Sequence, residues 1–402
     1  MPRPQTSAEA PGAVLRDRDI VCVGFAEWDT ELWTNQHHLM SRLARNNRVL
    51  FIESLGLRRP QLAGRDLARI ARRLRTGLAP PRLMNGVWVQ SPLVLPFHGF
   101  EPARRLNAAL LPVLVRRGIA RLGSTRPILW SYVPQAEVLL DALDPALVVY
   151  HCVDDIASQP GIDGQSFRAA EARFAARADL VLASAPALAR RMRELNDSVL
   201  FAPNVADTAL FSRALESGPV DEELDALPHP RIVFTGAVVA SKLDFRLIVE
   251  LARASPDSSI ALVGPVGPGD PSTDVGPLRA EPNIHLLGRR DHARLPEVLR
   301  GADAAIIPYA RNTLTDSIFP MKVYEYLAAG LPMLATRLPS LEGVGDVIFA
   351  ADGAEMARLA AEAIASDGPQ LREQRSQRAA GHSWERRLQE IELALEGEVE
   401  LG

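Results

Sequence analysis

Two charged side chains, one helical turn apart, lie in the stretch from Ile318 to Thr336, which reads IFPMKVYEYLAAGLPMLAT. Pro320 is typical of the first turn of a helix, and Gly330 is typical of the residue that ends one. Lys322 and Glu325 are three residues apart and therefore point the same way. An ammonium beside a helix N-terminus can bind phosphate, and a carboxylate one turn later can accept hydrogen bonds from sugar hydroxyls. The stretch predicts a site for a nucleotide diphosphate; the alternative is an exposed ion pair that contributes little to stability.

Lysine is rare in this chain. Lysine and arginine together number 45, but only Lys242 and Lys322 are lysines. Lysine is ordinarily among the commonest residues, so the base composition of the genome is the expected cause. A compact ammonium fits a phosphate oxygen where a planar guanidinium does not. The two remaining lysines are therefore candidate phosphate ligands, with chance survival as the alternative.

The composition indicates a globular protein of two or three domains, with 402 residues, 47% hydrophobic and 23% charged. Cys22 and Cys152 lie in or at the end of apolar runs, which predicts buried thiols in a reducing compartment. The histidines show no metal-ligand spacing, so we expect neither a metal nor a cofactor. No apolar run is long enough to span a membrane and no apolar segment follows Met1, which favours a cytoplasmic location.

Short apolar runs alternate with helical patterns along the whole chain, as expected for parallel sheets with helices on both faces. The first series of predicted strands is Ile20–Phe25, Val49–Ile52, Ile128–Val133, Val148–His151, Leu180–Ala183 and Val199–Ala202. The second series is Ile232–Gly236, Ile260–Gly264, Ile284–Leu287, Ala304–Pro308 and Met333–Thr336. The fold class is therefore α/β, with two doubly wound, Rossmann-like domains.

The acidic, proline-containing segment 217–230 (SGPVDEELDALPHP) is typical of a linker. It divides a first domain, 18–216, from a second, 231–375. Residues 1–17 are expected to form a loose tail. Residues 376–402 are expected to form a terminal helix, with an apolar face made of Trp384, Leu388, Ile391 and Leu395.

A ligand of two such domains is expected in the cleft between them, at the carboxyl ends of the strands. The first strand of each domain is followed by a single glycine, Gly24 or Gly236, and neither is followed by a G-x-G-x-x-G pattern. This disfavours a dinucleotide-dependent dehydrogenase. The chain also lacks a Walker A sequence.

The paired domains, the terminal helix and the motif PMKVYEYLAAGLP resemble a GT-B glycosyltransferase of the retaining, nucleotide-sugar-dependent kind. The stretch WTNQHHLMSRLARNNRVLFIES, together with YHCVDD at 150–155, is similar to bacterial transferases of the teichuronic acid biosynthesis type. The resemblance implies two domains that face a cleft and a terminal helix that returns to the first domain.

The resemblance also implies roles for residues of the second domain. Glu325 matches the family's ribose-binding glutamate, and Lys242 matches its phosphate-binding lysine, six residues after Gly236. Ala237 stands where the family has an arginine, and Ser317 where it has a second glutamate. Lys322 is a candidate for the second cation. The predicted donor-binding residues are Gly236, Lys242, Ser317, Pro320, Lys322 and Glu325, with UDP as the favoured nucleotide.

Candidates for the acceptor side lie in the first domain. His151, Asp154 and Asp155 follow a predicted strand and, with Lys242, are the predicted catalytic residues. The alternative for the two aspartates is a helix N-cap.

Four aromatic and histidine side chains near the first strand are predicted to bind the acceptor. An indole of Trp28 or Trp33 could stack on a sugar, and His37 or His38 could reach the cleft. The alternatives are packing against the neighbouring helix for the tryptophans and a structural role for the histidines.

The stretch from Ser41 to Arg126 carries 17 arginines and three acidic residues, in a chain with a net charge of −4. Within it, residues 65–75 (RDLARIARRLR) predict a basic amphipathic helix. We expect a peripheral contact with an anionic membrane surface; an ordinary solvated face is the alternative. Nucleic acid is disfavoured because aromatic residues do not alternate with the basic ones.

These observations predict a cytoplasmic glycosyltransferase, peripheral on the inner face of the membrane. It would move a sugar from a nucleotide diphosphate to an envelope-polysaccharide, lipid-linked or other glycoside acceptor. The alternatives are a nucleotide-sugar 2-epimerase of the same fold and a non-catalytic GT-B-like binding protein.

Overall fold

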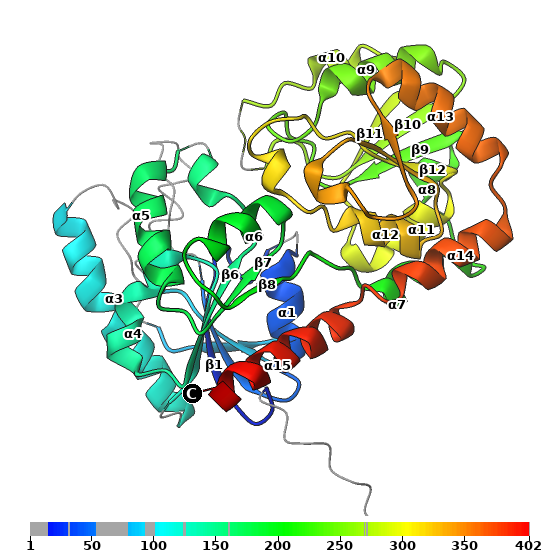
Figure 1. Cartoon of the computed structure of the whole chain (residues 1–402). Helices are drawn as coiled ribbons and strands as arrows, with labels where there is room; N and C mark the ends of the chain where they lie inside the picture. Colours follow the sequence, from blue (N-terminus) through cyan, green and yellow to red (C-terminus); the bar gives the residue numbers. More distant parts are fainter. Residues whose placement is uncertain are drawn as a thin grey trace, which may run out of the picture. The chain divides into compact units, whose positions relative to one another are not determined.

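The chain divides into two compact units (Figure 1). The computed structural model describes residues 15–30, 33–53, 79–92, 101–123, 126–159, 161–268, 270 and 272–401. The first unit comprises the described residues up to 184, with 188–202 and those from 388 onward. The second unit comprises 185–187 and 203–387.

The first unit contains a sheet that has eight strands within the described residues, in the order β3-β4-β2-β1-β5-β6-β7-β8. The strands are β1 (Asp19–Val23), β2 (Arg48–Ile52), β3 (Arg82–Met84), β4 (Val87–Gln90), β5 (Ile128–Ser131), β6 (Leu147–Cys152), β7 (Leu180–Ala183) and β8 (Val199–Phe201). Neighbouring strands are parallel, except that β3 and β4 form an antiparallel pair. The helices that follow these strands are α1 (Asn35–Leu43), α3 (Glu101–Leu122), α4 (Glu137–Leu143), α5 (Gly164–Ala175) and α6 (Pro186–Arg193).

The second unit contains a parallel sheet in the order β11-β10-β9-β12-β13-β14. The strands are β9 (Arg231–Thr235), β10 (Ser259–Val263), β11 (Ile284–Gly288), β12 (Ala304–Ile307), β13 (Met333–Thr336) and β14 (Val347–Ala350). The helices are α7 (Thr208–Phe211), α8 (Glu222–Asp225), α9 (Phe245–Ala254), α10 (Gly276–Arg279), α11 (Leu295–Arg300), α12 (Lys322–Ala328), α13 (Gly353–Ala365) and α14 (Pro369–Ala379). Helix α15 (Trp384–Leu401) begins in this unit and continues in the first.

The second unit begins earlier than the sequence suggested, at residue 203 and not within 217–230. The supposed linker packs on this unit, because Leu224 of α8 is fully buried in its core. Asp221 caps α8 through the Leu224 N–H and pairs with Arg290 at 2.5 Å. At the other end of the chain, Leu15 is buried, and its N–H donates to Glu392 Oε1 at 3.2 Å.

Candidate functional site

The strand order of the second sheet reverses between β9 and β12. Strands β10 and β11 lie on one side of β9, and β12, β13 and β14 lie on the other side. Loops that leave the carboxyl ends of two such strands diverge, and ligands bind in the space that this creates. The loop after β9 carries Lys242, and the connection after β12 carries Ser317 and leads into α12. The topology therefore places three predicted donor-binding segments at one switch point.

Gly236 lies at the carboxyl end of β9 and permits a close approach by Lys322. A Cβ on Gly236 would lie 2.4 Å from Lys322 Cε and 2.7 Å from Nζ, and the glycine has a φ of +136°. The Lys322 Nζ also lies 5.5 Å from the centre of the Phe234 ring. The Lys322 side chain thus extends from α12 to the end of β9. It passes through space that a Cβ at position 236 would occupy, so only glycine is compatible with this contact.

Glu325 lies on α12, one turn after Lys322. Its side chain is buried, with 7% exposure. Burial raises the pKa of the Glu325 carboxyl above its ordinary value, and the nearby side chains of Lys322 and His292 oppose that rise. The carboxylate therefore lies within the electrostatic reach of the lysine ammonium, in surroundings where hydrogen bonds to a ligand are strong.

Lys242 lies on a loop whose backbone is held from both sides. On one side, the Ser241 N–H donates to Asp270 Oδ2 at 3.1 Å, and the Ala240 N–H donates to Thr273 Oγ1 at 3.2 Å. On the other side, the Ala310 N–H donates to the Lys242 carbonyl at 2.8 Å. Among the residues that the structure describes, the Lys242 ammonium has no ion-pair partner. The fold thus fixes the backbone at this lysine and leaves its charge available.

Ser317 and Pro320 lie between β12 and α12. Ser317 ends a short 3₁₀ turn and is nearly buried, and Pro320 is buried. The prediction that Pro320 lies in the first turn is wrong, because α12 begins at Lys322 after Met321. The prediction that Gly330 ends the helix is confirmed by its φ of +76°. Pro320 therefore shapes the entry to α12 and is not part of the helix.

The predicted acceptor residues of the first unit lie in one aromatic cluster. The Trp28 ring is 4.9 Å from Phe51 and 5.3 Å from His37, measured between ring centres, and Trp33 stacks on His37 at 5.9 Å. Trp28 is 2% exposed, whereas Trp33 is half-buried. Trp28 therefore packs against its neighbours, and Trp33 keeps the more accessible indole.

His37 and His38 are both buried on α1. The Thr34 N–H donates to His37 Nδ1 at 3.1 Å, and His37 Nε2 donates to the Glu27 carbonyl at 3.0 Å. Burial lowers the pKa of His37, which keeps this imidazole neutral. Both ring nitrogens of His37 are thus used to hold the start of α1, which favours the structural alternative for this residue.

The predicted catalytic residues at the end of β6 have different surroundings. His151 is 2% exposed and stacks on Tyr132, with ring centres 4.8 Å apart. Asp154 is half-buried, and Asp155 is 3% exposed. The side chain of Asp155 does not cap the short turn that follows it. The N-cap alternative therefore does not apply to Asp155.

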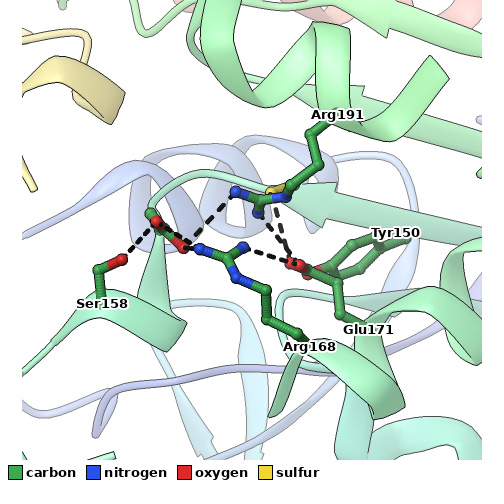
Figure 2. A network of polar contacts seen from close by, with 7 residues as sticks. Tyr150, Ser158, Arg168, Glu171 and Arg191 are labelled. Carbon is green, nitrogen blue, oxygen red and sulfur yellow. Dashed lines mark hydrogen bonds and ion pairs between the residues drawn. The ribbon is translucent and has the colours of Figure 1, made fainter. Parts of the chain in front are cut away.

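Asp155 instead belongs to a network of buried charges, shown in Figure 2. Arg168 Nη2 donates to both Asp155 oxygens, at 2.9 and 2.8 Å, and Ser158 Oγ donates to Oδ2 at 2.6 Å. Arg191 Nη2 donates to Glu171 Oε2 at 3.1 Å, and its Nη1 lies 3.5 Å from Asp155 Oδ1.

The same network reaches β6, because the Tyr150 hydroxyl donates to Glu171 Oε1 at 2.7 Å. It thereby joins α5, α6, β6 and the loop that carries Asp154. Asp155 is committed to this network, which leaves Asp154 as the more accessible carboxylate of the pair.

The reasoning from sequence missed several polar residues around these positions. Glu53 accepts from the Trp28 N–H at 2.7 Å and from Ser91 Oγ, and Tyr132 donates to Asn35 Oδ1 at 2.9 Å. Their partners are distant in sequence, so spacing could not reveal them. Glu53 directly follows β2, and a carboxylate at the end of a buried strand was the one available signal.

Within the described ranges, no group of three or more His, Cys, Asp or Glu side chains is arranged to hold a metal ion. The helices of these ranges also include none that is long and apolar enough to cross a bilayer. The predicted amphipathic helix at 65–75 lies outside the described residues.

We predict that Asp155→Ala lowers the free energy of unfolding by about 2–4 kcal/mol, because it removes a buried carboxylate that Arg168 and Arg191 share and leaves Glu171 to balance both arginines. The partial exposure of Arg168 favours the lower end of this range. Urea denaturation measures the change. The control is Asp141→Ala, which removes an exposed pair with Arg177 and is expected to cost less than about 1 kcal/mol. Equal losses in the two variants would contradict a structural role for the network.

Comparison with known proteins finds a family match within the second unit. Residues 229–366 match the family described as Glycosyl transferases group 1. Over 246 residues the chain is 30% identical to TuaH of Bacillus subtilis (strain 168), which its description places among teichuronic acid biosynthesis glycosyltransferases. This match covers 58% of the chain and 60% of the relative, so the chain spans less than two thirds of that protein.

Solved structures share the fold over nearly the whole length of the chain. Sucrose-phosphate synthase from Thermosynechococcus elongatus has a TM-score of 0.63 at 16% identity, over 94% of this chain and 98% of that one. HepE of Anabaena in complex with UDP has a TM-score of 0.62 at 14% identity, over 94% and 100%. These identities show the fold alone, and they confirm the predicted GT-B architecture. The chain therefore has the GT-B fold, and its residues 229–366 are similar to the glycosyl transferases group 1.

Proposed function

We propose that the protein transfers a sugar from a UDP-sugar to a saccharide or lipid-linked acceptor of the cell envelope, with retention at the anomeric carbon. The observation that carries this proposal is the approach of Lys322 to Gly236, with Glu325 one turn further along α12. HepE, which has the same fold, was solved with UDP, and the description of TuaH names teichuronic acid. The free, buried cysteines support a reducing, cytoplasmic compartment.

The donor is proposed to bind the second unit with its diphosphate at the end of β9. Lys322 and Lys242 neutralise the two phosphates, which compensates for Ala237, a position at which the family resemblance implies an arginine. Glu325 accepts hydrogen bonds from the ribose hydroxyls. These groups bind in partly dry surroundings, where each charge-assisted hydrogen bond contributes about 1.5–3 kcal/mol.

Transfer breaks the bond between the anomeric carbon and the phosphate oxygen, and the electron pair stays on the departing UDP. The anomeric carbon passes through an oxocarbenium-like state while negative charge grows on the diphosphate. Preorganised cations stabilise that charge more in the transition state than in the bound donor, which lowers the barrier. Lys322 and Lys242 are therefore the proposed electrostatic catalysts.

The acceptor hydroxyl forms the new bond to the anomeric carbon and loses its proton to a donor phosphate oxygen or to Asp154. Asp154 is the better side-chain candidate because it is half-buried, whereas Asp155 is 3% exposed. His151 is proposed to orient the loop through its stack on Tyr132. Trp33 offers the accessible indole for an acceptor sugar.

A thermal-shift screen with UDP-, GDP- and dTDP-sugars tests the proposal. UDP-sugars should raise the melting temperature most, since ligands that bind the folded state stabilise it. Lys322→Ala should weaken UDP binding about 10- to 100-fold, through the loss of a charge-assisted hydrogen bond. Gly236→Ala should weaken it similarly, because the new methyl group displaces the lysine.

Gly345→Ala is the matched control, since a Cβ at Gly345 meets nothing within 4 Å. Circular dichroism establishes that each variant is folded; if Gly236→Ala is not, Lys322→Ala carries the test. Unchanged UDP affinity in Lys322→Ala would refute the proposed donor site.

Glu325→Gln should weaken donor binding and yet stabilise the unliganded fold above about pH 5. Because the folded pKa of Glu325 is raised, the wild type binds this proton more tightly when folded and loses stability as pH rises from about 4.5 through the raised pKa. The glutamine variant lacks that loss. Its advantage in urea denaturation should therefore grow with pH and then level off. Glu342→Gln, at an exposed position, is the control and should show no such trend.

Transfer activity should persist in excess chelator, because lysine side chains are proposed to neutralise the diphosphate. The measurement is the release of UDP from the donor that the screen identifies, with and without EDTA. A complete loss that Mg²⁺ restores would show that a metal ion, and not the lysines alone, balances the phosphate charge.

A further inference from the structure

Helix α3 of the first unit carries apolar side chains on two opposite sides. Leu111, Leu114, Val115 and Ile119 are buried against the sheet side. Leu106 and Val113 are 46% and 45% exposed, and both are among the most exposed large apolar residues of the described chain. They are seven residues apart, which is two turns, so they lie on the same outer side of the helix.

Arginines flank this outer apolar line on both sides. At about 100° per residue, Arg105 and Arg116 fall on one side of the line from Leu106 to Val113, and Arg117 and Arg121 fall on the other. All four are exposed. The only acidic residue of α3 is Glu101, at its first position. We call Arg105, Leu106, Val113, Arg116, Arg117 and Arg121 the α3 outer face.

The acidic residues of the neighbouring helix do not neutralise this face. Helix α4 packs beside α3 at the margin of the first unit (Figure 1). Its two acids pair with arginines of α5 and the residues after it: Glu137 with Arg173 at 2.9 Å, and Asp141 with Arg177 at 2.7 Å. The Arg116 Nε donates to the neutral Ala142 carbonyl at 2.6 Å, so its charge is not compensated by that contact.

We propose that the α3 outer face binds the surface of an anionic phospholipid bilayer. Leu106 and Val113 enter the boundary between headgroups and acyl chains, and the arginines reach outward to the lipid phosphates. The charge of the face complements such a surface. A nucleic acid fits less well, because the centre of the face is aliphatic and offers no aromatic ring for a base to stack on.

The test uses the full-length protein and flotation with vesicles of phosphatidylcholine, with or without about one third phosphatidylglycerol. Binding is expected only to the anionic vesicles and should weaken as salt increases. Each arginine near the surface contributes about 1 kcal/mol, or roughly five-fold in binding, so Arg117→Gln with Arg121→Gln should lower binding about 25-fold. Leu106→Ser with Val113→Ser should lower it separately, at unchanged charge.

The matched control is Arg190→Gln with Arg193→Gln, which removes the same charge from exposed positions on α6 of the same unit. It should bind nearly as the wild type does. Circular dichroism and donor binding verify that each variant is folded. Equal binding by the α3 and α6 variants, equal binding to neutral vesicles, or tighter binding to a duplex DNA than to anionic vesicles would each overturn the proposal.

Discussion

The candidate donor site depends on the absence of a side chain at Gly236. A methyl group there would occupy the space of the Lys322 side chain, and a methyl group on Gly264 would lie 1.9 Å from the Gly236 carbonyl oxygen. The ends of β9 and β10 and the start of α12 can therefore approach each other only through glycines. The next loop is held in place at Ser241, whose N–H donates to Asp270 Oδ2 and whose carbonyl accepts from Asn312 Nδ2.

The two units use positive charge in different ways. In the first, Arg168 and Arg191 each lie beside both Asp155 and Glu171 and so tie separate elements together. A planar guanidinium suits this task because it presents several donors in a fixed geometry. In the second, Lys322 places one compact charge at the end of β9, and Lys242 carries another on the loop after that strand. A chain with 43 arginines and two lysines thus keeps lysine where a flexible ammonium is useful.

Much of the fold could be predicted because buried parallel strands are short apolar runs, and all eleven expected strands correspond to strands of the structure. The β3–β4 hairpin was missed, although Asn85-Gly86, both with positive φ, is a strong hairpin signal. The supposed linker was misjudged because the acidic residues that suggest a loop also cap a short helix, as Asp221 does.

Sequence spacing also revealed part of the candidate site. Lys322 and Glu325 are close in sequence, so helical geometry alone places them together. Spacing could not show that Arg168 binds Asp155, or that His37 is used at both nitrogens, because those contacts depend on tertiary packing.

The division of the chain has a practical consequence. Apart from residues 185–187 at the start of α6, the second unit is one uninterrupted stretch, 203–387, whereas the first unit includes residues from the end of the chain. The chain passes from one unit to the other near both ends of that stretch, where the Ala206 N–H donates to the His382 carbonyl at 3.2 Å. The second unit can therefore be excised as a single piece whose ends are already joined by this hydrogen bond, while the first unit must be assembled from two fragments.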